Sequence, residues 1–216
     1  MIATRGVIGR HRRSPQPLAF RAEFPQSSPR IPQNSPTPFL EQEKMAIKIG
    51  VALYFIPPKN NLPGYFHWAI VATTASSWNV QPVMVYEIKR SMSGRFVQSF
   101  TSERLDGSSA FTGIVDIFTT TAYSTFDQIS DRLVSIGAQD RGWRFPGRFG
   151  PEAGWDCTAW VLQALQRFRD DRAWNVPDEI FLKVYTSILN RGNEMLYSGA
   201  SAYIKTVPLN RAQRGY

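Results

Sequence analysis

The hydrophobic pattern divides the chain into a strand-forming part and a helix-forming part. Between residues 46 and 120, short runs rich in β-branched and aromatic residues alternate with clusters of turn-forming residues. This pattern predicts strands joined by short loops. Because consecutive strands with short connections usually pair with each other, we expect an antiparallel meander. The expected strands cover 46–56, 66–74, 82–90, 95–101 and 112–120.

Helical spacing follows the last strand. A first helix is expected to end at Gly137, because glycine readily adopts the conformation that closes a helix. A second helix is expected over 155–171, where the apolar residues fall on one stripe and Asp156 can cap the first turn. A third helix is expected to begin at Pro177 and to run to about Asn190.

The first 44 residues show no sustained hydrophobic period. They hold seven prolines and six arginines, and such a segment cannot bury enough surface to offset its ordering entropy. We therefore expect a disordered leader at 1–44, an α+β domain at 45–207 and a frayed tail at 208–216. Two other interpretations of the leader stay open: sequence upstream of a natural start at Met45, or a mitochondrial targeting peptide.

Composition narrows the classes of function. Half of the net charge of +8 lies in the leader, and the arginines of the domain are scattered, so we expect no nucleic-acid partner. No run of 18 apolar residues occurs, so no transmembrane segment is expected. A single cysteine, Cys157, excludes an intramolecular disulfide and favours a reducing, cytoplasmic location. One cysteine and one histidine, His67, are too few ligands for a typical metal site in the domain, and no cofactor is expected.

Cys157 and His67 each occupy a position that suits thiol chemistry. Cys157 falls at the first turn of the 155–171 helix, where free N–H groups and the helix dipole favour a thiolate. His67 begins a predicted strand directly after a loop that contains proline and glycine. A thiolate beside an imidazole is a pair of nucleophile and base. The competing interpretation is that both are ordinary packing residues.

Two short strings carry a resemblance to a known superfamily. His67-Trp-Ala-Ile and Asp156-Cys-Thr-Ala-Trp-Val resemble the circularly permuted NlpC/P60-like proteins, which include lecithin:retinol acyltransferase-like and PPPDE-like members, and look closer still to small fungal proteins with both strings. In these relatives a strand that begins with histidine precedes the helix that cysteine opens, which reverses the papain order. The resemblance covers roughly residues 67–170.

The resemblance implies both a fold and an activity. The fold would be a permuted papain-like α+β domain, its antiparallel meander sheet packed by the cysteine-bearing helix and a C-terminal helix. The activity would be that of a cysteine hydrolase (a thiol peptidase or amidase) or an acyltransferase. Either would act on a peptide, amide or lipid acyl substrate through an acyl-thioester intermediate. A catalytically inactive papain-like interaction module is the alternative.

The sequence departs from the family pattern next to the nucleophile and at the third catalytic position. Asp156 stands where the relatives have Asn. The negative charge of an acid there opposes thiolate formation, unless the carboxylate instead interacts with the N–H groups at the start of the helix as a cap. The second histidine of the acyltransferases is missing. Alignment of the strand after His67 gives Glu87 the role of orienting the imidazole. Asn79, Gln81 and a merely solvated Glu87 are alternatives.

Other residues near the two strings have simpler interpretations. Trp68 and Trp160 are expected in the core, whereas Trp143 and Trp155 are candidates for lining an apolar substrate groove. The arginines of the loop before the cysteine are expected to be solvated, with binding of a carboxylate or phosphate as the alternative; they are Arg141, Arg144 and Arg148.

Overall fold

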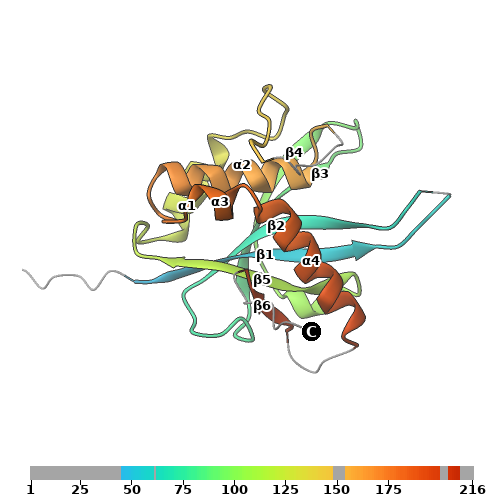
Figure 1. Cartoon of the computed structure of the whole chain (residues 1–216), viewed down its shortest axis with the longest axis horizontal. Coiled ribbons are helices and arrows are strands. Elements are labelled where there is room, and N and C mark those ends of the chain that lie inside the picture. The colour runs from blue at the N-terminus through green and yellow to red at the C-terminus, as the bar shows by residue number, and fades with distance from the viewer. Residues whose placement is uncertain (1–44, 61, 148–153, 200–203, 210–216) are drawn as a thin grey trace, which may run out of the picture. The chain divides into compact units, whose positions relative to one another are not determined.

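The computed structural model describes residues 45–60, 62–147, 154–199 and 204–209. This part of the chain is an α+β structure built on a six-stranded, mostly antiparallel sheet (Figure 1). The leader predicted at 1–44 lies outside the described residues. The strands are β1 (Ile47–Ile56), β2 (Tyr65–Thr73), β3 (Val83–Arg90), β4 (Phe96–Glu103), β5 (Phe111–Thr120) and β6 (Thr206–Pro208).

The order of the strands is β4-β3-β2-β1-β5-β6. The predicted meander is therefore right for β1 to β4 and wrong for β5, which pairs antiparallel with β1 instead of β4. The burial pattern explains this placement. Ile114 and Val115 point to opposite faces of β5 and both are fully buried, whereas no residue of β4 is buried. A strand that is apolar on both faces belongs in the middle of a sheet, and a connection that contains the 3-10 helix Leu105–Gly107 carries the chain there.

The short strand β6 was not predicted, because three residues are too few to show an alternating pattern. It pairs parallel to β5, from Ile114↔Thr206 to Asp116↔Pro208. Leu209 is also buried, and its N–H donates to the carbonyl of Asp116 at 3.0 Å. The ordered chain thus extends past the boundary predicted at residue 207, while residues 210–216 lie outside the described part.

The predicted third helix is in fact two helices, and it extends beyond Asn190. The helices are α1 (Phe126–Val134), α2 (Cys157–Asp170), α3 (Asp178–Phe181) and α4 (Val184–Tyr197). Gly192, which favours a helix end when only the sequence is considered, lies inside α4. A Cβ atom there would be 2.8 Å from Cδ1 of Leu53, so glycine allows α4 to approach β1 closely. None of the described helices combines the length and apolarity needed to cross a membrane.

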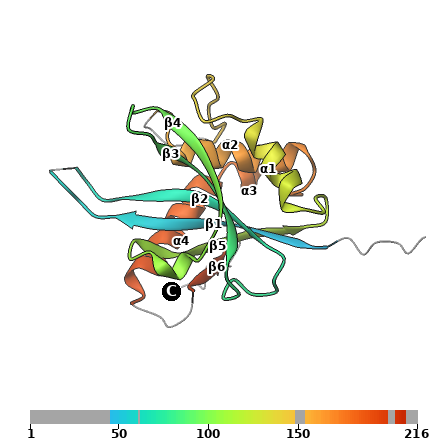
Figure 2. The same cartoon turned by 180° about the vertical axis from the view of Figure 1, so that it is seen from behind.

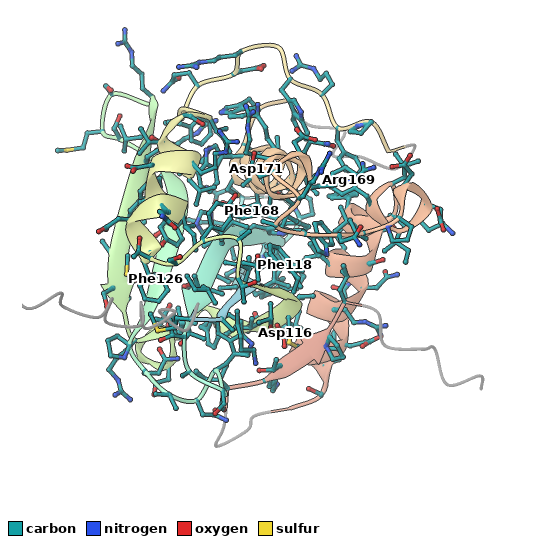
Figure 3. All side chains as sticks on the ribbon, turned by 90° about the vertical axis from the view of Figure 1, so that its left-hand side faces the viewer. Asp116, Phe118, Phe126, Phe168, Arg169 and Asp171 are labelled. Atoms are coloured by element: carbon teal, nitrogen blue, oxygen red, sulfur yellow. The ribbon has the colours of Figure 1, made fainter. Side chains whose placement is uncertain are left out.

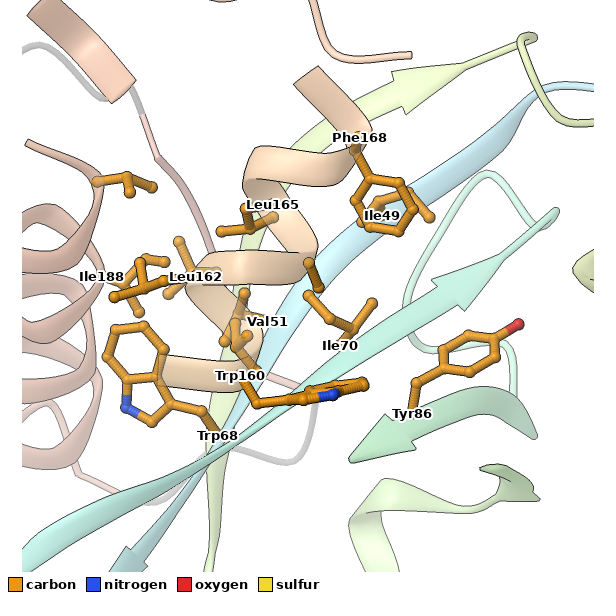
Figure 4. Close-up of a cluster of buried hydrophobic side chains, with 14 of the residues drawn as sticks. Ile49, Val51, Trp68, Ile70, Tyr86, Trp160, Leu162, Leu165, Phe168 and Ile188 are labelled. Carbon is orange, nitrogen blue, oxygen red and sulfur yellow. The ribbon is translucent and has the colours of Figure 1, made fainter. Parts of the chain in front are cut away.

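Helices α2 and α4 cover one face of the sheet (Figures 1 and 2). Trp68 and Trp160 are both buried there, as predicted (Figure 4). At the far end of α2, the rings of Phe168 and Phe118 meet edge to face with centroids 5.8 Å apart (Figure 3). The opposite face carries a smaller apolar cluster, which includes Ala69 of β2.

Candidate functional site

His67 and Glu87 project from neighbouring strands to the same face of the sheet. Side chains alternate along a strand, so His67 shares the face of Ala69, and Glu87 shares the face of Val85. Ala69 and Val85 both belong to the smaller cluster. The two polar side chains therefore project to the same side of β2 and β3, where they meet.

A hydrogen bond joins these two side chains. Nε2 of His67 and Oε2 of Glu87 are 2.7 Å apart, and Glu87 is only 5% exposed. The other carboxylate oxygen, Oε1, is 2.7 Å from Nζ of Lys89. Each oxygen of Glu87 thus has a basic partner, and the carboxylate cannot turn without breaking one of the two contacts.

Cys157 is the first residue of α2. The preceding residue, Asp156, is the N-cap: its Oδ1 accepts a hydrogen bond from the N–H of Ala159 at 2.9 Å. This confirms the predicted cap and directs the carboxylate charge to the amides of the first turn. Cys157 is 8% exposed, and its side chain is close enough to the imidazole of His67 to be one of the causes that raise the pKa of His67.

The environment of His67 favours the protonated ring. Burial alone would lower the pKa of His67, but hydrogen bonding with Cys157 and with Glu87 outweighs burial and raises the pKa from 6.5 to about 9. Burial raises the pKa of Glu87, but hydrogen bonds with His67 and Lys89 reverse this and hold the pKa of Glu87 below its usual value. At neutral pH the group is therefore an imidazolium held by a carboxylate, close to the side chain of Cys157.

Asp156 responds differently because it is partly buried without a cation in direct contact. Burial raises the pKa of Asp156, and the backbone N–H groups of Ala159 and Thr158, together with the charge of His67, only partly offset the rise. The pKa of Asp156 is therefore shifted in the opposite direction to that of Glu87, although both are carboxylates close to His67.

Folding stability should fall as pH rises through the range set by His67. The folded state retains a proton between pH 6.5 and about 9 that the unfolded chain releases, so this contribution is complete below pH 6.5 and is lost as pH rises through 9. We expect the loss to reach at most about 3 kcal/mol. Urea titrations at several pH values measure it, with His67→Gln as the control. Parallel profiles of the two proteins would contradict the expectation.

Of the three candidates for orienting the imidazole, Glu87 is the one that contacts it. Asn79 uses its Oδ1 to accept from the N–H of Ile204 at 2.9 Å. Gln81 accepts from the N–H of Leu105 at 3.1 Å and donates to a backbone carbonyl at 2.7 Å. Both amides therefore support loops, and the interpretation of Glu87 as a solvated residue is wrong.

The loop residues near Cys157 in the sequence are mostly engaged elsewhere. Nε1 of Trp155 donates to the carbonyl of Ala138 at 2.7 Å, so this indole anchors the loop to the end of the α1 segment. Trp143 packs near Phe145, with ring centroids 6.4 Å apart. Neither observation places a groove beside Cys157.

The three arginines of the loop before Cys157 differ in exposure and in ion pairing. Arg144 pairs with Asp140 at 3.2 Å, and Arg141 is exposed. Arg148 lies outside the described residues. The expectation of solvated arginines therefore holds for Arg141, while Arg144 is exposed but paired.

Two residues of the site were not predicted. Lys89 follows Glu87 by two positions, so strand alternation could have placed both on one face. Tyr54 is the cross-strand partner of His67, and the two ring centroids are 6.0 Å apart. Burial raises the pKa of Tyr54 well above its usual range, and the nearby charge of Glu87 adds to this. Only the pairing of β1 with β2 brings Tyr54 to the site.

Among the described residues, no group of three or more His, Cys, Asp and Glu side chains could hold a metal ion. The arrangement of Cys157, His67 and Glu87 is one that nucleophilic catalysis uses: a thiol, an adjacent base and a group that orients the base. No protein-family model, curated protein or solved structure matches this chain.

Proposed function

We propose that the protein is a cysteine hydrolase or acyltransferase of the permuted papain-like, NlpC/P60-like kind. Cys157 is the nucleophile, His67 the base and then the acid, and Glu87 the residue that orients His67. The observation that carries the proposal is the position of one imidazole, which interacts with the thiol of Cys157 and is hydrogen-bonded to a buried carboxylate at 2.7 Å. Three elements, β2, β3 and α2, supply these groups.

The reaction has two steps. His67 takes the proton of the Cys157 thiol, and the resulting thiolate attacks the carbonyl carbon of the acyl substrate. The new C–S bond forms as the carbonyl π electrons move to oxygen. His67 gives its proton to the leaving amine or alkoxide as that bond breaks, which leaves an acyl-thioester. His67 then takes a proton from water or another acceptor, whose oxygen or nitrogen attacks the thioester and releases the thiolate.

The start of α2 supplies a donor for the developing oxyanion. In the first turn, the amides of Thr158 and Ala159 bind the Asp156 side chain, and the amide of Trp160 bonds to the Asp156 carbonyl. The N–H of Cys157 is the first-turn amide that these interactions do not use. A backbone donor at the N-terminus of a helix stabilises negative charge on the tetrahedral intermediate.

Labelling with a thiol-reactive probe across pH tests the proposal. Cys157 is the single cysteine of the chain, so all labelling reports on it. We expect the folded protein to be labelled near neutral pH, where an ordinary thiol with a pKa of about 8.5 is mostly protonated. In His67→Ala the labelling profile should move up by about one pH unit or more, because the thiolate loses its imidazolium partner.

Two outcomes separate the proposal from its alternatives. Identical labelling profiles for wild type and His67→Ala would show that the two residues are not a catalytic pair, and would favour the inactive interaction module. Labelling that occurs only after unfolding in urea would show that Cys157 is a packing residue. Glu87→Gln is the milder variant: it keeps the shape of the side chain and should change the profile less than His67→Ala.

Lys89 should influence the pKa of His67 through its contact with Glu87. Lys89→Met removes the cation on Oε1 of Glu87, so the carboxylate acts more strongly on the imidazolium, and the pKa of His67 should rise. Because the Lys89 side chain is half exposed, we expect a rise of at most about half a pH unit. NMR titration of the His67 ring measures it, with His67→Gln to assign the signal. Lys89→Arg should restore the wild-type value, and a pKa that falls in Lys89→Met would contradict this role.

A further inference from the structure

Two hairpin tips lie at the same end of the sheet. Strands β1 to β4 are consecutive antiparallel neighbours, so the β1–β2 and β3–β4 connections both lie at the end where β1 finishes and β4 begins. Figures 1 and 2 show the β1–β2 connection extending beyond the helices at this end, with the β3–β4 connection on the same side of the molecule. We call the described residues of 57–66 and 89–97 the paired tips.

The paired tips expose large apolar side chains to solvent. Leu62 is 69% exposed, Tyr65 59% and Val97 46%, and Met92 is fully exposed. These are four of the nine large hydrophobic residues that are exposed in the described part of the chain, although the tips are a small fraction of it. Exposed apolar side chains gathered at one end of a protein usually mark an interaction surface.

The charge on the paired tips has one sign. Lys59, Arg90 and Arg95 are exposed there, and the described residues of 57–66 and 89–97 include no Asp or Glu. Lys89 is also present, but it is paired with Glu87. Apolar side chains at the tips are thus surrounded by cations that no acidic residue of the same segments neutralises.

We propose that the paired tips bind an anionic lipid surface. Leu62 and Met92 enter the boundary between headgroups and acyl chains, while Lys59, Arg90 and Arg95 meet the lipid phosphates. Apolar side chains with flanking cations are what peripheral binding to anionic membranes requires. The occupant is a bilayer rather than a folded partner, because exposed aliphatic side chains and cations without acidic neighbours in the same segments lie together at loop tips, which is the combination that an anionic lipid interface accepts.

Membrane docking would place the candidate site close to the lipid. Tyr65 is two residues before His67, and Lys89 is two residues after Glu87, so each tip is continuous with a strand that carries a site residue. The inference does not rest on the proposed function, because lipid binding is measured without any reaction. A failure to bind lipid would say nothing about the Cys157–His67 pair. A failure of the thiol-labelling experiment would likewise say nothing about lipid binding.

Sedimentation of the full chain with vesicles tests the inference. One set contains phosphatidylcholine alone and the other phosphatidylcholine with about 30% phosphatidylserine, a composition that gives the negative surface potential the cations require. We expect binding to the second set at about 0.1 M salt and much weaker binding at 1 M salt, where the Debye length falls to about 3 Å. No binding to the anionic vesicles would overturn the proposal.

Variants at the tips decide where the lipid binds. Leu62→Ser with Met92→Ser, and separately Arg90→Gln with Arg95→Gln, should each weaken binding at least about tenfold, since a surface cation contributes about fivefold. The matched controls are Val134→Ser on α1 and Lys183→Gln between α3 and α4, both exposed and outside the tips. If both tip variants bind as well as wild type, the lipid-binding residues lie elsewhere in the chain and the proposal is wrong.

Discussion

Replacing Cys157 with serine should abolish thiol-probe labelling and lower any acyl-transfer or hydrolysis rate by about a thousandfold or more. A serine hydroxyl is a far weaker nucleophile than a thiolate next to imidazolium, and the chain has no second cysteine to replace it. A suitable measurement is the burst of p-nitrophenol from p-nitrophenyl esters. Wild type should release about one equivalent per chain as the acyl-thioester forms, and the variant should show no burst.

The fold of Cys157→Ser should persist, because the two side chains are nearly the same size. We expect a change in the free energy of unfolding within about 1–2 kcal/mol, the range for placing a hydroxyl at a buried site with a hydrogen-bonding neighbour. Circular dichroism and urea unfolding check this. Cys157→Ala is the second variant, since it leaves no nucleophile at all. A burst of wild-type size in either variant would rule out Cys157 as the nucleophile.

Replacing Trp160 with alanine should destabilise the protein by about 3–5 kcal/mol, the range for truncating a buried aromatic side chain. Trp160 belongs to α2 and is fully buried, in the cluster that also contains Ile70 and Tyr86 (Figure 4). Its Nε1 also donates to the carbonyl of Gly137 at 2.9 Å, which connects α2 to the turn after α1. The lower urea midpoint, at unchanged denaturant dependence, measures the loss.

Trp160→Phe separates packing from hydrogen bonding. Phenylalanine keeps most of the apolar contact but leaves the Gly137 carbonyl without this donor, so we expect a loss of about 1–3 kcal/mol. A loss below about 1 kcal/mol in Trp160→Ala would mean that α2 does not pack on the sheet as described. The site would be affected as well, because α2 positions Cys157.

The positions of the elements were largely determined by the sequence. Strands β1 to β5 form where β-branched and aromatic residues alternate between turn signals, and these local preferences survive in the folded chain. The start of α2 was equally clear, because Asp156 is a strong N-cap ahead of an apolar stripe. Through this helix start, the sequence also determined where Cys157 would lie.

The relations between elements were decided by the tertiary structure. β5 lies beside β1 because a strand that is buried on both faces is stabilised inside a sheet. No local pattern in the sequence predicts which strand it pairs with. Gly192 remains inside α4 because the helix must approach Leu53 closely, which is a contact between residues far apart in the chain.

The residues of the candidate site also fall into two groups: those that the sequence indicated and those that only the folded structure identified. Residue type and position singled out His67 and Cys157, since each lies at or near the start of an element whose start is encoded locally. The choice of Glu87 over Asn79 and Gln81 was not local: all three are polar residues close in sequence to β3, and only the packed sheet brings one of them to the imidazole at 2.7 Å. Side-chain partners depend on strand register and on the hydrogen bonds that loops require, and both are properties of the folded chain.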